Sequence, residues 1–510
     1  LQDNGANSPH DAIDFGQIIQ LTDGDGDHVT LNGSFSVSFK DDIPTVSLST
    51  HKDFHSHAAP VVIDESAGQH DNDINHSLSV FSGVQHTGSD PDMGTQYAQS
   101  KLLAPLVDAD VQFGADGPGS AKWSIELNPS NNDSGLRTTD HHEIRLFQEG
   151  GLIVGRYDTS DGAVDSSDPA AFAIAIDPAT GQISIVQYVS IENTTPGNPD
   201  ETNFLNANEV YVRLTVTDYD GDSVSDTIDI GQQIGFSDDG PTLDIRVDRS
   251  ALNGLDVTLD ETVGADRYSS TDNVAGDTDV NGGPNSDDVA GALAQRTTDF
   301  SGSGLLGLFN VVEHAGADGV GSESFQLSFT GLGSTTVASG GDALGHWGDG
   351  IATNLSATAT ATTHGGAIKL FLDSATNAAG SHDIVGYDAD GHLALRIGIV
   401  DVGGHLQLQT TLYEALNDGN DNNQFDHSLT LALTGQGASI GLNYAGSLTD
   451  GDGDTATDNA TVTLISSSRN PGYFVFQDDG PAILSVTQFA GGDVPNTFMF
   501  DGFTENGGVW

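Results

Sequence analysis

One composite acidic signature occurs three times along the chain, and this periodicity limits the chain to a tandem-repeat architecture. Its first element reads LTDGDGDHVT, VTDYDGDSVS and LTDGDGDTAT at Leu21–Thr30, Val216–Ser225 and Leu448–Thr457. A strand-like stretch follows each copy, and then a second element, FKDDIPT, FSDDGPT or FQDDGPA, at Phe39–Thr45, Phe236–Thr242 and Phe476–Ala482. The spacing is 197 residues from Asp41 to Asp238 and 240 from Asp238 to Asp478. The sequence therefore predicts the C-terminal part of a preceding repeat (1–43), a repeat at 44–240, a longer one at 241–480, and the start of the next (481–510).

The bodies of the two whole repeats match in the same order. VIDESAG at Val62–Gly68 resembles LDETVG at Leu259–Gly264, and GADGPGS at Gly114–Ser120 resembles GADGVGS at Gly316–Ser322. Chance rarely preserves such an order, so we expect both repeats to share one fold.

The apolar residues follow the period of two that marks half-buried strands. Val210, Val212, Leu214 and Val216 alternate with polar residues, as do Phe172, Ile174 and Ile176. Turns rich in Gly, Asp and Asn separate these stretches, as tight hairpins require. We predict an all-β chain of tandem β-sandwich repeats, Ig-like or cadherin-like with Greek-key topology, arranged as an extended rod.

The charge of the chain restricts its partners. The 510 residues hold 74 acidic and only 15 basic side chains, for a formal net charge of −59, and no cysteine. Such a chain repels nucleic acid and anionic membranes, and it cannot form disulfides or thiolate metal sites. No apolar run is long enough to insert in a bilayer. Leu1 and Trp510 look like cuts in a longer polypeptide. Plain solubility or a halophile surface would explain the charge, but the Asp residues cluster in motifs, which favours bound cations.

The first element is a D-x-D-G-D loop, which is the strongest candidate for a metal site. Alternate carboxylates across a Gly-containing loop converge on one point and need a cation to offset their repulsion. Ca²⁺ suits such a loop, because it accepts six to eight oxygens in flexible geometry. An acidic hairpin turn without an ion is the alternative. The candidate ligands are Asp23, Asp25, Asp27, Asp218, Asp220, Asp222, Asp450, Asp452 and Asp454.

The second element, D-D-[GI]-P, predicts a stiff linker with a bridging ion, because proline fixes its own φ and restricts the residue before it. Its carboxylates are Asp41, Asp42, Asp238, Asp239, Asp478 and Asp479. We expect their partners to be the acidic pairs that follow each junction, Asp64/Glu65 and Asp260/Glu261. A solvated linker without an ion is the alternative.

Other motifs point less clearly to chemistry. The GADG stretches at Asp116 and Asp318 are interpreted as Gly-rich hairpins, and His51, His55, His57, His141 and His142 as loop histidines. Neither a nucleophile elbow, a phosphate loop nor HExxH is present in the sequence, so we expect no enzyme.

The combination of the D-x-D-G-D loop and the D-D-G-P element resembles the repeats of very large type I secreted bacterial proteins, the RTX adhesins with cadherin-like or Ig-like repeats. The resemblance implies calcium-binding β-sandwiches that stiffen into the arm of a cell-surface adhesin. It also implies an extracellular location, roles in cell attachment and biofilm formation, and a terminal ligand-binding domain outside this sequence. Ile43 departs from the Gly of the other junctions, and the nonapeptide array of the family is absent.

Two further functions compete with a spacer whose partners are the adjacent repeats of its own chain. One is a subunit of a self-assembling extracellular filament or surface layer, in which copies of the chain pack together. The other is a ligand-binding module for glycans or ice, suggested by the Thr-rich stretch Ala357–Thr363.

Overall fold

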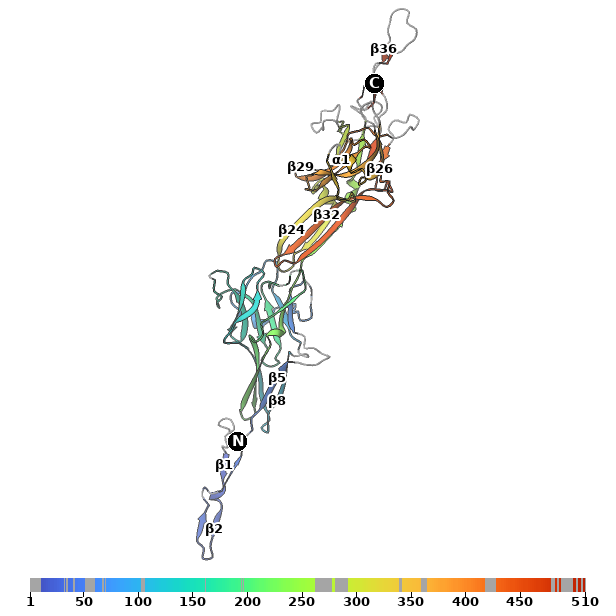
Figure 1. Ribbon diagram of the computed structural model, residues 1–510. Coiled ribbons are helices and arrows are strands. Elements are labelled where there is room, and N and C mark those ends of the chain that lie inside the picture. Colours follow the sequence, from blue (N-terminus) through green and yellow to red (C-terminus); the bar gives the residue numbers. More distant parts are fainter. Residues whose placement is uncertain are drawn as a thin grey trace, which may run out of the picture. The chain divides into compact units, whose positions relative to one another are not determined.

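A computed structural model gives the fold of the chain (Figure 1). The structure describes residues 11–31, 33, 35–39, 42–50, 60–66, 68, 70–101, 106–160, 162–193, 195, 197–261, 278–279, 292–338, 342–358, 365–417, 428–477, 482–483, 486–487, 499–500, 503–505 and 508–509. Asp41, Asp478, Asp479 and most of the Thr-rich stretch, from 359 onward, lie outside these residues, as do His51, His55 and His57.

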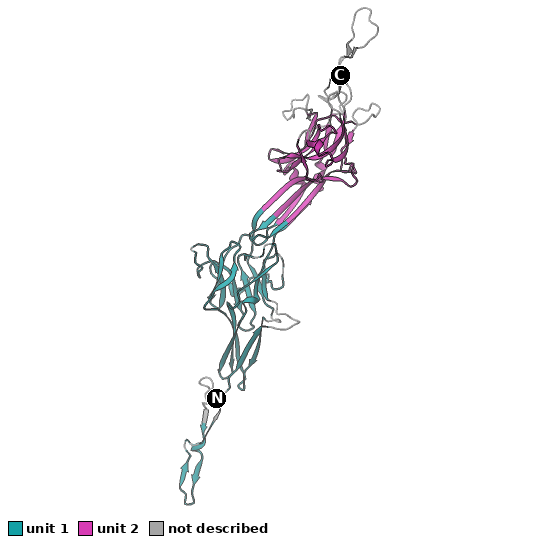
Figure 2. Cartoon of the chain, in the orientation of Figure 1, with its two compact units in different colours: residues 1–242, 314–322, 448–456 teal, residues 243–313, 323–447, 457–510 magenta. Residues whose placement is uncertain are grey.

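The chain forms two compact units that are not simple consecutive halves (Figure 2). The first unit comprises 1–242 together with 314–322 and 448–456, and the second comprises 243–313, 323–447 and 457–510. The first change of unit, between Thr242 and Leu243, follows the D-D-G-P element directly. The two short segments belong to the second repeat by sequence, but they are part of the first compact unit.

The first unit contains a β-sandwich. One sheet has the order β10-β11-β12-β13-β14-β7, and the others are β15-β18-β6, β17-β16-β9 and β5-β8. The strands are β5 (Thr45–Thr50), β6 (Val61–Asp64), β7 (Gln96–Gln99), β8 (Val107–Gln112), β9 (Pro118–Leu127), β10 (Asp133–Arg137), β11 (Glu143–Glu149), β12 (Leu152–Tyr157), β13 (Ala170–Ile176), β14 (Ile183–Gln187), β15 (Thr202–Phe204), β16 (Val210–Asp218), β17 (Ser223–Asp229) and β18 (Ile234–Ser237). Pairing is antiparallel except between β18 and β6, which run parallel.

The core of this sandwich lies between the six-stranded sheet and the smaller sheets. Phe172 of β13 meets Phe236 of β18 with ring centroids 4.7 Å apart, and both rings are buried. Gly155 of β12 leaves room for the Phe172 ring, since a Cβ there would lie 2.5 Å from Cζ of Phe172. The alternation of β16 (BiBiBiBiB in burial) follows the predicted period of two.

Strand β13 differs from the half-buried strand that the sequence predicts, because all seven of its residues are buried. Phe172 and Ile174 face the main core, whereas Ala173 and Ala175 join a second cluster with Phe81. Phe81 ends the short 3-10 helix η2 (Ser79–Phe81), so a connecting segment covers the outer face of the sheet. The small alanines on that face allow this second layer to pack closely.

The second unit repeats the same plan. Its largest sheet has the order β21-β22-β30-β29-β28-β27-β25, with β26 also paired to β27, and its smaller sheets are β20-β34-β31, β24-β32-β33 and β19-β23. The strands are β19 (Thr242–Val247), β20 (Val257–Asp260), β21 (Thr278–Asp279), β22 (Ala294–Thr297), β23 (Phe309–His314), β24 (Val320–Thr330), β25 (Thr336–Val337), β26 (Ile351–Ala357), β27 (Gly366–Thr376), β28 (His382–Tyr387), β29 (Leu393–Val402), β30 (His405–Leu412), β31 (Ser428–Thr430), β32 (Ser439–Asp450), β33 (Thr455–Ser466) and β34 (Phe474–Gln477). The parallel pair β20–β34 corresponds to β6–β18. The tandem β-sandwich fold predicted from the repeats is therefore confirmed.

The remaining elements are short. They are β1 (Asp11–Asp14), β2 (Gln20–Thr22), β3 (His28–Thr30), β4 (Ser36–Phe39), β35 (Ala482–Ile483), β36 (Val486–Thr487), β37 (Met499–Phe500), β38 (Phe503–Glu505), β39 (Gly508–Val509), α1 (Asp342–Gly345) and the 3-10 helices η1 (Phe15–Gln17), η3 (Gly231–Gln233), η4 (Ala251–Gly254) and η5 (Gly304–Leu308). Among the described residues, no helix has the length and apolar character needed to span a membrane.

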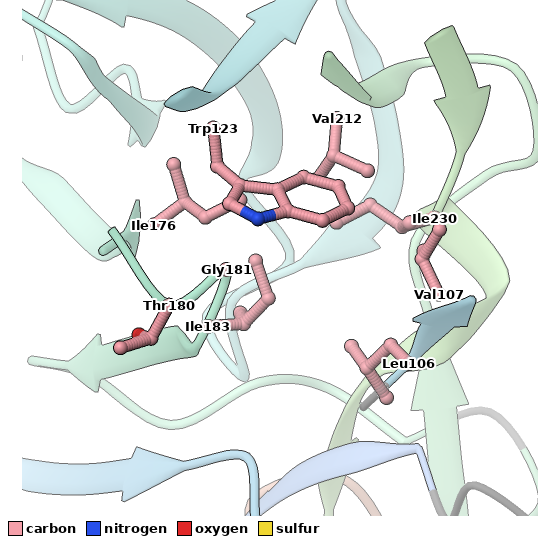
Figure 3. A pocket seen from close by; sticks show the side chains of 9 residues that line it. All are labelled: Leu106, Val107, Trp123, Ile176, Thr180, Gly181, Ile183, Val212 and Ile230. Carbon is pink, nitrogen blue, oxygen red and sulfur yellow. The ribbon is translucent and has the colours of Figure 1, made fainter. Parts of the chain in front are cut away.

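An apolar pocket in the first sandwich lies beside Trp123 (Figure 3). Its walls include Ile176, Ile183, Val212 and Gly181, and the cavity measures about 20 Å³. That volume holds about one water molecule. The pocket is thus a small packing gap and does not offer a ligand site.

Candidate metal centre

The three D-x-D-G-D loops have one backbone geometry. In the loop at 218–222, Oδ1 of Asp218 accepts hydrogen bonds from the amides of Gly221 (3.1 Å) and Asp222 (2.8 Å). The amide of Asp218 donates to the carbonyl of Asp222 at 3.0 Å, closing the hairpin. Gly221 has φ of +117°, a conformation that glycine adopts without strain.

The same bonds recur in the other two loops, so the motif fixes the loop independently of its surroundings. The Asp23 and Asp450 carboxylates each accept from the amides three and four positions later. Asp23, Asp25 and Asp27 are exposed, whereas Asp450 and Asp454 are each only 2 % exposed. The loop conformation is thus the same in all three copies, and the surroundings decide whether the carboxylates are solvated, as at Asp23, or buried, as at Asp450.

The buried loop belongs to a five-carboxylate cluster within the first unit. Ligand atoms of Glu65, Asp238 and Asp318 lie within 4.8 Å of one another, and so do those of Asp318, Asp450 and Asp452. Asp318 is common to both groups. The cluster is assembled from the end of β6, the end of β18, the GADG turn before β24 and the loop between β32 and β33.

Each carboxylate of the cluster has one oxygen held by the protein and one that no hydrogen-bond partner reaches. Oε1 of Glu65 accepts from Gln187 Nε2 and from the Ile191 amide, whereas its Oε2 has no partner. Oδ1 of Asp238 accepts from the Asp239 amide at 2.8 Å, and its Oδ2 has none. Glu65 and Asp238 are 3 % and 1 % exposed, so water does not solvate these oxygens.

The carboxylates contributed by the second repeat follow the same pattern. Thr139 donates to Oδ1 of Asp318, and the Asn193 amide donates to Oδ2 of Asp452 at 3.2 Å. Asp318 Oδ2, Asp450 Oδ2 and Asp452 Oδ1 are buried without a partner. Buried ionised oxygens are costly unless they are paired or bind a metal. This donor set of anchored carboxylates, each with a spare oxygen, fits a hard divalent cation.

The electrostatics of the cluster agree with this fit. Burial raises the pKa of Asp238 from its ordinary 3.8 to about 8, with a further contribution from the neighbouring charges of Asp318 and Asp452. Burial likewise raises the pKa of Asp450 to about 7 and that of Asp318 to about 6. The pKa of Glu65 is raised well above its usual value, mainly by burial. Without a cation, it is therefore unfavourable for all of these carboxyl groups to be ionised together near neutral pH.

Two glycines of the GADGxGS motif make the assembly sterically possible. A Cβ on Gly321 would lie 2.0 Å from the carbonyl oxygen of Asp450, and one on Gly119 would lie 2.0 Å from that of Asp218. The GADGxGS segment and the D-x-D-G-D loop of one repeat therefore pack backbone against backbone, and both repeats use the same contact.

The second Asp of the D-D-x-P element has a separate role. Both oxygens of Asp42 accept from the amide of Ala115 in the first GADG turn, the shorter bond measuring 2.9 Å. Asp239 makes the equivalent bond to the amide of Ala317 in the second turn. The end of one repeat thus holds the GADG turn of the next.

The partners predicted for the D-D-x-P element need a correction. Glu65 lies with Asp238, at the end of its own repeat, and not with the preceding junction at Asp42. The reason is that β6 pairs in parallel with β18, which places Asp64 opposite Ser237. Glu261 lies in the second unit, where its carboxylate accepts from the Leu416 amide at 3.0 Å. Asp64 accepts from the Ser66 amide and lies 3.4 Å from His70 Nδ1, outside the cluster. The side chain of Asp260 is not among those described.

Sequence reasoning missed Asp318. The GADG stretch forms a turn between β23 and β24, but it is not the predicted hairpin, because β23 pairs with β19 and β24 pairs with β32 in a separate sheet. Its Asp318 also links the two carboxylate groups. Thr139 and Asn193, which anchor Asp318 and Asp452, carry no motif at all. A repeated GADG at a fixed place in both repeats was the one available signal for Asp318.

A pocket of about 490 Å³ lies beside Glu65. Ser66, Asp239, His314 and Ala317 are among the residues that line it together with Glu65.

Comparison with known proteins gives a family likeness without a known activity. Residues 60–231 match the family described as "Domain of unknown function (DUF5801)". This segment contains Glu65 and the loop at Asp218–Asp222 but not Asp238 or Asp318. No curated protein matches the chain. Among solved structures, "Protocadherin gammaB7 EC3-6 cis-dimer structure" aligns at 11 % identity over 81 % of this chain and 100 % of that one. Its TM-score of 0.08 is too low to support any conclusion about fold or function.

Proposed function

We propose that this chain is a calcium-stiffened spacer in the arm of a large extracellular bacterial adhesin. The observation that carries the proposal is the buried cluster of Glu65, Asp238, Asp318, Asp450 and Asp452, each with an oxygen that lacks a partner. The cluster joins carboxylates from the first repeat to carboxylates of two turns from the second. Bound Ca²⁺ would hold these turns against the first sandwich and make successive repeats one mechanical piece.

The two carboxylate groups that share Asp318 are suited to two neighbouring ions. Glu65, Asp238 and Asp318 would hold one, and Asp318, Asp450 and Asp452 the other. All the donors are oxygens, as a hard divalent cation requires, and Ca²⁺ is favoured over Mg²⁺ because it accepts several carboxylates in flexible geometry whereas Mg²⁺ gives up its water molecules reluctantly. In a calcium-poor cytosol the repelling carboxylates would keep the linkage loose, and binding of calcium outside the cell would complete folding.

The experiment is a thermal melt of the calcium-stripped chain, repeated with Ca²⁺ and with Mg²⁺, combined with small-angle X-ray scattering. A spacer should melt at a higher temperature with Ca²⁺ than with Mg²⁺, remain monomeric, and give a narrower distribution of dimensions. Equal melts in all three conditions would refute the calcium mechanism. Calcium-dependent association of copies would instead support the filament.

A further inference from the structure

A second type of metal centre is indicated inside the second unit, away from the five-carboxylate cluster. The loop between β28 and β29 reads D-A-D-G-H at Asp388–His392. It has the spacing of the D-x-D-G-D loops, with histidine in place of the last aspartate. Ligand atoms of Asp388, His392 and Glu414 lie within 4.8 Å of one another.

The backbone of this loop closes as in the acidic loops, although the first aspartate accepts from the amides two and four positions later and not three and four. Oδ1 of Asp388 accepts from the amides of Asp390 (3.0 Å) and His392 (2.7 Å), and the Asp388 amide donates to the His392 carbonyl at 2.9 Å. Gly391 has φ of +86°, like the glycines of the other loops. The exchange of Asp for His therefore changes the chemistry of the last ligand and keeps the loop that presents it.

Glu414 supplies an independent indication of a ligand. Its Oε2 is buried and has no hydrogen-bond partner. The Asp388 side chain beside it is 0 % exposed, whereas that of His392 is 45 % exposed, so the site opens to solvent on the histidine side. Burial raises the pKa of Glu414 to about 7, with a further contribution from Asp388. Nδ1 of His392 lies 3.3 Å from Oδ2 of Asp388, and a metal ion among the three side chains would offset the repulsion between the two carboxylates.

The first repeat has a different residue at the position that Glu414 occupies in the second. The Ile191 amide donates to Glu65 in the first repeat, and the Leu416 amide donates to Glu261 in the second, so Ile191 and Leu416 occupy equivalent positions. Two residues before each of them stand Val189 and Glu414, which are therefore counterparts. The preceding tyrosines agree, because the Tyr188 and Tyr413 amides donate to Ala171 and Ala394 at 2.8 Å each. Val189 is 5 % exposed within the core. The fold accommodates an apolar residue here, so Glu414 is not needed for the fold.

We propose that Asp388, His392 and Glu414 bind one borderline divalent transition-metal ion of the zinc class, and that this site is selective against Ca²⁺. Imidazole nitrogen is a good ligand for Zn²⁺ and its neighbours in the first transition row, whereas Ca²⁺ takes oxygen. Three protein ligands with an open side leave a coordination position for water or for a group from another molecule. The chain would then hold two kinds of metal site on loops of similar structure, one with oxygen ligands alone and one with oxygen and nitrogen ligands.

The test is a Zn²⁺ titration of the metal-stripped chain by isothermal calorimetry, in the presence of excess Ca²⁺ to occupy all-oxygen sites. The wild-type chain should bind one equivalent of Zn²⁺ in micromolar range or tighter. Glu414→Val, which copies the first repeat, and His392→Asp, which restores the acidic loop, should each lose that equivalent. His346→Asn is the matched control, because His346 is about as exposed as His392 and also lies near two carboxylates, but those of Asp342 and Asp349 are 46 % and 55 % exposed.

Circular dichroism and thermal melts in chelator separate loss of the site from loss of the fold. Glu414→Val should melt at the wild-type temperature or above, since it removes a buried carboxylate. Retention of the zinc equivalent in either site variant, its loss in His346→Asn, or its displacement by excess Ca²⁺ would each overturn the proposal. These outcomes are independent of the calcium response at Asp318, so this proposal and the spacer function can fail separately.

Discussion

The hydroxyl of Thr139 donates a hydrogen bond to Oδ1 of Asp318, although 179 positions separate the two residues in the sequence. Thr139 also shares a hydrogen bond of 2.8 Å with Ser190, which fixes its hydroxyl in the first sandwich. A turn of the second repeat is thereby positioned by the first repeat. Asp318 is left with its other oxygen in the carboxylate cluster, where it belongs to both candidate ion sites.

Asp318→Asn should uncouple the stability of the chain from calcium. Removing one charge from a repelling cluster raises the melting temperature of the calcium-free chain, while the loss of a shared ligand lowers calcium affinity by about tenfold or more. Calcium titrations and melts of both chains measure the two effects.

The matched control is Asp110→Asn, which removes a carboxylate from an exposed position on β8. It should leave the calcium affinity of the cluster unchanged. If the two variants respond alike to calcium, the effect of Asp318 is one of net charge and not of ligation.

Gly321→Ala should reduce calcium binding without removing a ligand. The new Cβ would lie 2.0 Å from the Asp450 carbonyl oxygen, so the acidic loop must shift away from Asp318. We expect a smaller rise in melting temperature on addition of Ca²⁺. Gly348→Ala is the control, because a Cβ there meets no atom within 4 Å. A wild-type calcium response in Gly321→Ala would show that the packing of these two turns does not position the ligands.

The stability of the calcium-free chain should fall as the pH rises from about 4 to about 8. Asp238, Asp450 and Asp318 have pKa values of about 8, 7 and 6 when folded and an ordinary value of 3.8. The folded chain therefore holds more protons than the unfolded chain across this interval, and the free energy of unfolding decreases with pH. Denaturant unfolding of metal-stripped chain at several pH values measures the slope.

Asp238→Asn is the companion variant for this pH dependence. Repulsion among all the acidic residues of the chain also lowers the free energy of unfolding as the pH rises. The variant is needed to separate the contribution of the cluster from this general effect. It should flatten the slope between pH 6 and 8, and an unchanged slope would assign the pH dependence to the remaining carboxylates.

Gly155→Val tests the packing of the first core. A Cβ at this position would lie 2.5 Å from the ring of Phe172, which itself packs on Phe236. Overpacking of this kind costs about 1–3 kcal/mol of unfolding free energy, measurable by urea denaturation. Gly83→Ala, where a Cβ meets no atom within 4 Å, should differ little from wild type, and equal losses in both variants would contradict this packing.

The sequence predicts the sandwiches well because alternation and repetition are local signals. β16 follows its predicted period throughout, and the acidic loops close with the hydrogen bonds that their glycines allow. The cluster was harder to predict, since parallel pairing of β6 with β18 decides where Glu65 lies, and no local pattern encodes that pairing. Glu414 was missed for a related reason, because only the alignment of the two repeats in space shows that it replaces Val189.

The most direct test of the central claim is the anomalous diffraction of crystals of this chain grown with Ca²⁺. Bound calcium predicts an anomalous peak 2.3–2.6 Å from carboxylate oxygens of Glu65, Asp238 and Asp318, and a second beside Asp450 and Asp452. Well-ordered carboxylates in saturating Ca²⁺ with no anomalous peak between them would contradict the account.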